Sequence, residues 1–216
     1  QGSACRVPSL SSSSSIAVCG WKDHPMSEQN APAPVAPYMA LGRSTVIYGI
    51  SERRQIRHNL ETVEEAIHAN ISMVNINMPV RLIALSEGAL TGFTDEIFDL
   101  PHVMAARELF IDIPGEETEY LGRLAKLYNL YIIGQCKARW PQVMKDRYFN
   151  SLFVIGPDGQ VVHRAAKNHV WCRERSCMPH DIYDRWVDLF GDGIEAFEYV
   201  DDDLGPVSVI GTGCGA

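Results

Sequence analysis

Residues 131–164 read YIIGQCKARWPQVMKDRYFNSLFVIGPDGQVVHR, and this stretch decides the class of fold. Its start, 131–135, is apolar and rich in residues that favour a strand. Residues 151–155 and 160–164 then flank Gly156-Pro-Asp-Gly159, and Pro followed by Asp-Gly is strong turn chemistry. The two flanking segments therefore predict a β-hairpin, and we expect the late part of the sheet to be antiparallel.

Upstream of this stretch, the sequence predicts strands that alternate with helices. Residues 44–50 (STVIYGI) and 80–85 (VRLIAL) are short apolar runs that favour strands. Two amphipathic helices are predicted over 54–70 and 116–129, because apolar residues recur there at spacings of three and four. The residues expected to face inward are Ile56, Leu60, Val63 and Ile67 in the first helix and Leu121, Leu124, Ala125 and Tyr128 in the second.

Downstream of the hairpin, residues 197–200 and 207–210 predict two late strands. Between the hairpin and these strands, aromatic and apolar residues again recur at helical spacing: Tyr183, Trp186, Val187 and Phe190. This pattern indicates a short amphipathic helix with a core-facing side, rather than an aromatic box for a substrate. Together the elements predict an α/β fold, in which a mixed sheet is covered by helices.

The first 37 residues differ in composition from the rest of the chain. They contain eight of the serines, five of them consecutive at 11–15, and five of the twelve prolines. Such a segment cannot bury enough apolar surface to order itself, so we expect 1–37 to be a disordered leader. Met26 is a plausible true start. The folded domain is expected to cover 38–216.

Charge and composition exclude several classes of protein. The net charge of −8 argues against a protein that binds nucleic acid through phosphate contacts. There is no run of 18 apolar residues, so the sequence contains no membrane-spanning helix. The six cysteines are sparse in a chain long enough to build a core without disulfides. We therefore expect free thiols in a reducing compartment, the cytoplasm.

Three side chains are candidates for catalytic residues. Glu87 follows a predicted strand in Ser86-Glu-Gly-Ala-Leu-Thr-Gly-Phe93, Lys167 follows the hairpin, and Cys214 follows the last predicted strand. Taken singly, each has an ordinary interpretation: a solvated loop carboxylate, a surface lysine and a buried or frayed thiol. Gly-rich backbone beside the cysteine could also supply N–H donors to an oxyanion.

In combination, these segments resemble the nitrilase superfamily of carbon–nitrogen hydrolases. The family has a glutamate in a loop like 86–93, and a strand, an Asp-Gly turn and a lysine arranged as in Tyr148–Gly159 and Lys167-Asn-His169. A cysteine follows a later Gly-containing strand, as in 205–214. The resemblance covers about residues 43–214 and implies an αββα sandwich with mixed sheets covered by helices. Because family members continue well beyond this cysteine, the C-terminal part of that sandwich is expected to be missing.

The resemblance implies a cysteine-dependent hydrolysis of a small amide or nitrile. Cys214 would be the nucleophile, Glu87 the general base and Lys167 the cation that stabilises the oxyanion. A second glutamate assists in many members, and Glu174 is the acid at suitable spacing. The family needs no metal or organic cofactor, and its members commonly form homo-oligomers. No nucleic-acid or membrane partner is implied.

Two alternatives stay open. Cys214 falls later than the family strand would place it and lacks the aromatic-acid pair that usually follows, so a non-catalytic binding protein on the same fold is possible. The spacing of His169, Cys172, Cys177 and His180 also suggests a structural zinc site. The same stretch coincides with the variable loop after the family's lysine, which favours no metal.

Overall fold

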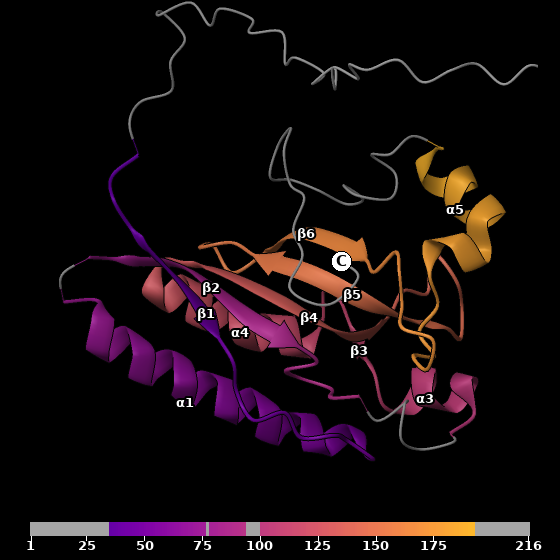
Figure 1. The fold of residues 1–216 in the computed structure, drawn as a ribbon, viewed down its shortest axis with the longest axis horizontal. Coiled ribbons are helices and arrows are strands. Elements are labelled where there is room, and N and C mark those ends of the chain that lie inside the picture. Colours follow the sequence, from indigo (N-terminus) through magenta and orange to yellow (C-terminus); the bar gives the residue numbers. More distant parts are fainter. Residues whose placement is uncertain (1–34, 77, 94–99, 193–216) are drawn as a thin grey trace, which may run out of the picture. The chain divides into compact units, whose positions relative to one another are not determined.

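The computed structural model describes residues 35–76, 78–93 and 100–192. The chain divides into two units, Gln1–Ala36 and Pro37–Ala216, and all described helices and strands belong to the second (Figure 1). Residues 1–34 of the predicted leader and the predicted late strands at 197–200 and 207–210 lie outside the described residues. No helix in the described part of the chain is long and apolar enough to cross a bilayer.

The described residues form one mixed sheet with strand order β1-β2-β4-β5-β6, in which β3 also pairs with β4. The pairs β1–β2, β2–β4 and β3–β4 are parallel, whereas β4–β5 and β5–β6 are antiparallel. This arrangement confirms the predicted mixed sheet. The strands are β1 (Met39–Arg43), β2 (Val80–Glu87), β3 (Ile111–Asp112), β4 (Tyr131–Arg139), β5 (Tyr148–Ile155) and β6 (Val161–Ala166).

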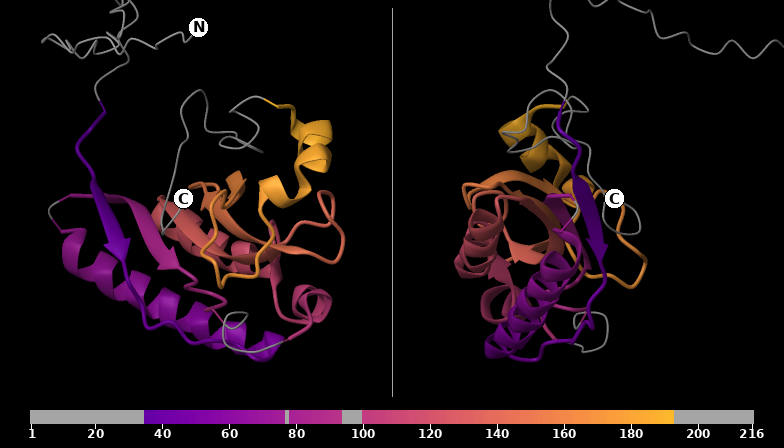
Figure 2. Two further views of the ribbon diagram at one scale, coloured as in Figure 1. Left: turned by 45° about the vertical axis from the view of Figure 1, so that its right-hand side comes forward. Right: turned by 90° about the vertical axis from the view of Figure 1, so that its left-hand side faces the viewer.

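Helices α1 (Ile56–Val74) and α4 (Glu116–Tyr128) cover one face of this sheet (Figure 2). Their predicted inner faces are confirmed, since Ile56, Leu60, Val63 and Ile67 of α1 and Leu121, Leu124 and Ala125 of α4 are buried. Tyr128, also predicted to face inward, is partly buried and packs against the same core. These residues form one apolar core with alternate residues of the strands, such as Ile132, Cys136 and Ala138 of β4. Burial of each large aliphatic side chain contributes about 1.5–3 kcal/mol.

The opposite face of the sheet is also apolar. Ile133, Leu152 and Val154 form a separate buried cluster there, because side chains alternate between the two faces of a strand. A sheet with two apolar faces is typical of a strand layer buried on both sides. The described residues thus contain one sheet of the expected α/β sandwich.

Short elements complete the described part of the chain. They are α3 (His102–Glu108), α5 (Tyr183–Phe190) and the 3₁₀ helices η2 (Arg53–Gln55) and η3 (Pro179–Ile182). The predicted helix around Tyr183 is confirmed as α5, and its Trp186 is fully buried against Trp140 and Phe149. Trp186 and Phe190 of this helix thus belong to a small core, as expected from their spacing, whereas Tyr183 is 47% exposed.

The prediction of a strand at 44–50 was wrong. The strand is β1, and its register pairs Met39 with Val80 and Arg43 with Leu85. Since β2 ends at Glu87, residues beyond 45 have no partner backbone in β2 and run as an irregular connection to α1. β-branched composition favoured the segment, but the available partner edge decided where pairing occurs.

Candidate active site

A cluster of charged side chains lies on the sheet face opposite α1 and α4. The register of the sheet assembles it, because Lys137 of β4 lies directly opposite Asn150 of β5, and both share the face of Ile133 and Leu152. Glu87 ends β2 and pairs with Gln135. We call this set the carboxylate–lysine cluster. Its members are Glu87, Lys137, Asn150, Lys167, Glu174 and Ser176.

Lys167 connects the two carboxylates of the cluster. Its Nζ lies 3.0 Å from Oε1 of Glu87 and 3.0 Å from Oε2 of Glu174. The side chains of Lys167 and Glu174 are 4% and 2% exposed, and that of Glu87 is 14% exposed. The structure therefore brings together three of the four predicted residues, of which Glu87 is 80 positions from Lys167 in the sequence. The fourth, Cys214, lies outside the described residues.

Lys137 is a second buried cation in the cluster. Its Nζ lies 2.5 Å from Oε1 of Glu174 and donates a hydrogen bond of 2.7 Å to Oγ of Ser176. Sequence reasoning missed Lys137, because the predicted strand ended at Gln135 whereas β4 continues to Arg139. With the longer strand, alternation would have placed this lysine on an inward-facing position.

Asn150 and Ser176 complete the hydrogen bonding of the carboxylates. The Nδ2 group of Asn150 donates to Oε1 of Glu87 at 2.5 Å and to Oε1 of Glu174 at 2.8 Å. The hydroxyl of Ser176 donates to the same oxygen of Glu174 at 2.6 Å. Asn150 belongs to the strand motif noted in the sequence, but neither residue was assigned a role. Buried carboxylates with this many donors are held in fixed orientations.

The cations determine the ionisation of Glu174. Burial alone would raise its pKa, but the charge and hydrogen bond of Lys137, with the hydrogen bonds from Ser176 and Lys167, lower the pKa to about 2. Burial would likewise lower the pKa of Lys167, but its hydrogen bonds to Glu174 and Glu87 raise the pKa above its ordinary value. At neutral pH, Glu174 is therefore a carboxylate and Lys167 an ammonium group.

The loop that carries Glu87 is fixed by the adjacent strand. The N–H of Gly88 donates to the carbonyl of Gln135 at 2.8 Å, and Thr91 Oγ1 accepts from the N–H of Lys137 at 3.1 Å. Gly88 has a φ of 75°, and a Cβ there would lie 2.8 Å from the ring of Phe93. This backbone conformation favours glycine at position 88.

The loop that carries Glu174 is fixed to β5. The N–H of Cys177 donates to the carbonyl of Tyr148 at 2.8 Å, next to a β-bridge between Phe149 and Cys177. His102 packs against the same part of β5, because its ring stacks on that of Tyr148 with centroids 4.1 Å apart. Burial and the nearby charges of Arg147 and Arg175 lower the pKa of His102 to about 4, so it is neutral at pH 7.

The described cysteines do not supply a nucleophile to the cluster. Burial raises the pKa of Cys136 far above its ordinary value and that of Cys177 to about 11, so both are thiols at neutral pH. Cys172 is exposed, and none of the hydrogen bonds or ion pairs that define the cluster involves it. Cys214 therefore stays the predicted nucleophile.

The zinc alternative finds no support in the geometry. All four of its predicted ligands are described, and no group of three or more His, Cys, Asp or Glu in the described ranges is placed to hold a metal ion. Cys177 is buried while Cys172 is exposed, and the rings of His169 and His180 lie 6.3 Å apart in a stacked arrangement. The residues are close in sequence but do not converge on one point.

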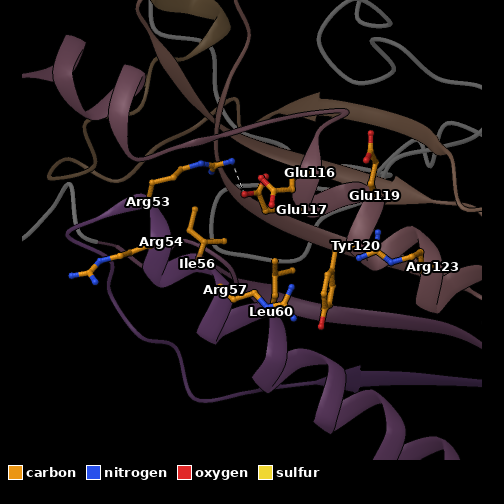
Figure 3. Close-up of a pocket in the computed structure, with 10 residues that line it drawn as sticks. All are labelled: Arg53, Arg54, Ile56, Arg57, Leu60, Glu116, Glu117, Glu119, Tyr120 and Arg123. Carbon is orange, nitrogen blue, oxygen red and sulfur yellow. Dashed lines mark ion pairs between the residues drawn. The ribbon is translucent and has the colours of Figure 1, made fainter.

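A separate charged pocket of about 310 Å³ lies between α1 and the start of α4 (Figure 3). It contains arginines and glutamates, but Arg53 points to Glu117 and pairs with it at 2.5 Å, and Arg57 pairs with Glu61 at 2.7 Å. No residue of the carboxylate–lysine cluster lines it. This pocket is on the helix side of the sheet and is not the candidate site.

Comparisons with known proteins find relatives in sequence. The chain is 32% identical over 100 residues to "Omega-amidase NIT2-B" of Xenopus laevis and to "Omega-amidase NIT2" of Xenopus tropicalis. Each match covers 45% of this chain and 35% of the relative, so the matched part of the chain spans about a third of these relatives.

Solved structures of similar proteins include a carbon-nitrogen hydrolase from Helicobacter pylori G27, with a TM-score of 0.44 and 16% identity over 62% of this chain and 41% of that one. Another is Nit3 of Saccharomyces cerevisiae, with a TM-score of 0.46 and 16% identity over 61% of this chain and 44% of that one.

The sequence profile of one family covers most of the chain and the whole candidate site. It is described as "Carbon-nitrogen hydrolase", and it matches residues 46–214. That range contains Glu87, Lys167 and Glu174, which the fold brings into contact, and also reaches Cys214. The match and the predicted motifs thus agree on the same segments of the sequence, and the chain belongs to the carbon–nitrogen hydrolase family of the nitrilase superfamily.

Proposed function

We propose that this protein hydrolyses the C–N bond of a small amide through a thioester on Cys214. The observation that carries the proposal is the position of Lys167, whose Nζ lies 3.0 Å from both Glu87 and Glu174 in a site with little exposure. A buried cation between two carboxylates provides a base and an oxyanion partner side by side. Membership of the family supports the same chemistry.

In the proposed acylation step, Glu87 takes the proton of the Cys214 thiol, and the sulfur attacks the carbonyl carbon of the amide. The carbonyl oxygen becomes an oxyanion that faces the Lys167 ammonium group. Collapse of this intermediate breaks the C–N bond, and Glu87 returns the proton to the departing ammonia. In the second step, Glu87 takes a proton from water and the hydroxide attacks the thioester carbon. The C–S bond then breaks, the acid leaves, and Glu87 returns the proton to the Cys214 sulfur.

The other members of the cluster hold these groups in place. Asn150 donates to both carboxylates and sets their separation. Glu174 accepts from Lys167 through Oε2 and keeps Nζ beside Glu87. The raised pKa of Lys167 supports its role, because an oxyanion partner must stay protonated at neutral pH.

The remaining features of the proposal rest on the relatives and the cysteines. An amide is the proposed substrate class, rather than a nitrile, because the curated relatives carry the name omega-amidase. We also propose a homo-oligomer, on the family resemblance alone. Cys136, Cys172 and Cys177 are free thiols, which supports a reducing compartment such as the cytoplasm.

The proposal is tested by measuring ammonia release from a panel of small amides. We expect activity in the unmodified protein and in Lys145→Met, which changes an exposed lysine outside the site. Glu87→Gln, Lys167→Met and Cys214→Ser should each lower kcat at least about a hundredfold, as expected for groups that act only in the transition state. Full activity in Lys167→Met, or none in any protein, would contradict the proposal and favour a non-catalytic binding role.

A further inference from the structure

Lys137 is the charged member of the cluster that the proposed mechanism does not use. It lies in β4 with 1% of its surface exposed, and a lysine in that setting requires a counter-charge. We propose that Lys137 is a positioning residue, which balances the charge of Glu174 so that Lys167 can serve Glu87 and the reacting carbonyl group. This inference rests on the proposed function, because it concerns the same site.

The two oxygens of Glu174 are divided between the two ammonium groups. Oε1 lies 2.5 Å from Nζ of Lys137, and Oε2 lies 3.0 Å from Nζ of Lys167. Lys167 makes its other contact, also 3.0 Å, with Oε1 of Glu87. The two carboxylates and two ammonium groups alternate along a chain Lys137–Glu174–Lys167–Glu87, and their charges sum to zero.

Lys137 is held so that it cannot turn away from Glu174. Its backbone N–H donates to Thr91 at 3.1 Å, and its Nζ donates to Ser176 at 2.7 Å. The register of β4 and β5 places it directly opposite Asn150, which contacts the same oxygen of Glu174. The Lys137–Glu174 pair is therefore fixed from the β2 loop, from β5 and from the loop after β6.

Without Lys137, the site would hold two carboxylates and one ammonium group. Like charges in a buried site raise the pKa of at least one carboxyl, which then takes up a proton. Protonation of Glu87 would remove the base, and protonation of Glu174 would weaken its hold on Lys167. Among the described residues, the charged and polar groups that face Glu174 are Lys137, Asn150, Lys167 and Ser176. Glu87 is linked to Glu174 through Lys167 and Asn150.

The first test measures stability and does not require activity. Unfolding by urea is compared for the unmodified protein, Lys137→Met and the control Lys145→Met between pH 7 and pH 4. At pH 7, Lys137→Met should raise the unfolding equilibrium constant about a hundredfold or more, because it leaves a buried carboxylate uncompensated. As the pH falls, Glu174 of the folded variant takes up a proton before the unfolded chain does. The loss of stability of Lys137→Met relative to the unmodified protein should therefore become smaller toward pH 4. The unfolding equilibrium constant of Lys145→Met should stay within about threefold of that of the unmodified protein at every pH.

A loss of stability in Lys137→Met that is equal at every pH would overturn the inference, since loss of packing alone does not depend on protonation. Should this variant not fold at pH 7, the double variant Lys137→Met, Glu174→Gln removes both charges. It should fold and be more stable than Lys137→Met, because no buried charge is then left alone. A double variant that is no more stable would also overturn the inference.

The second test measures hydrolysis of a small amide. Lys137→Met should lower kcat about tenfold or more, leave KM within about threefold, and move the acidic limb of the kcat/KM profile to higher pH. An unchanged acidic limb would overturn the inference. If the unmodified protein shows no hydrolysis, the proposed function fails, while the stability measurement still decides whether Lys137 balances the charge of Glu174.

Discussion

Replacement of Glu174 by glutamine keeps the shape of the side chain and removes its charge. No orientation of the new amide suits the site. Oε1 accepts hydrogen bonds from Lys137, Asn150 and Ser176, and Oε2 accepts from Lys167. The NH₂ group of glutamine must therefore face at least one ammonium group, and that donor loses its acceptor in a buried position.

The size of the effect follows from the pKa. The pKa of Glu174 is about 2 in the folded protein against an ordinary 4.5, and the side chain is 2% exposed. A shift of this size corresponds to about 3 kcal/mol of stability at pH 7. Because the folded pKa is depressed, this contribution is present above pH 4.5 and lost as the pH falls through 2. At pH 3 about 1 kcal/mol should remain.

Urea denaturation, followed by tryptophan fluorescence, measures the change in the free energy of unfolding at pH 7 and pH 3. We expect Glu174→Gln to lower the free energy of unfolding by about 3 kcal/mol at pH 7 and by about 1–1.5 kcal/mol at pH 3. Glu65→Gln, which changes an exposed carboxylate of α1, should change it by less than about 0.5 kcal/mol at both. A loss below about 1 kcal/mol at pH 7, or an equal loss at both pH values, would show that the charge of Glu174 does not stabilise the fold.

Three further predictions concern the surroundings of the site. Gly122→Ala should lower the free energy of unfolding, measured by calorimetry, by about 1–3 kcal/mol, because its Cβ would lie 2.4 Å from the carbonyl oxygen of Gly159. Gly42→Ala is the control, because a Cβ there would have no atom within 4 Å. Equal effects of the two substitutions would contradict the close approach of Gly122 to Gly159. With a pKa of about 4 for His102, the folded protein binds fewer protons than the unfolded chain between pH 6.5 and pH 4. Because His102 is only half-buried, solvent screening reduces the effect, and stability should fall by about 1–2 kcal/mol as the pH drops through this window. His102→Phe should lose that dependence, and an unchanged pH profile would argue against it. Iodoacetamide followed by peptide mass spectrometry should label Cys172 at pH 7.5 and leave the buried Cys136 and Cys177 unlabelled in the native protein; rapid labelling of Cys136 would show that β4 is more open than the structure indicates.

Helices and the hairpin could be predicted because their signals are local. The inner faces of α1 and α4 follow from apolar spacing, and the β5–β6 hairpin follows from its Pro-Asp-Gly turn. The strand predicted at 44–50 failed because pairing depends on a distant partner, and β2 pairs with Met39–Arg43 instead. Elements of a few residues, such as α3 and β3, carry too little pattern to be recognised.

The residues of the candidate site also fall into those that the sequence indicates and those that it does not. Motif spacing indicated Glu87, Lys167 and Glu174, and the structure places them in contact. Motif spacing did not indicate Lys137, whose partner Glu174 is 37 residues away and reaches it only through the loop after β6. A buried lysine in a strand is a signal that becomes visible only once the full length of β4 is known.

The central claim is that this cluster forms a thioester from a small amide with the help of Lys167. The most direct measurement incubates the protein with the amide and hydroxylamine and quantifies the hydroxamate, with peptide mass spectrometry to locate the acyl group. We expect hydroxamate formation and an acylated peptide containing Cys214 in the unmodified protein and in Lys145→Met, and neither in Lys167→Met. Hydroxamate formed equally well by Lys167→Met, or an acyl group on another cysteine, would contradict the claim.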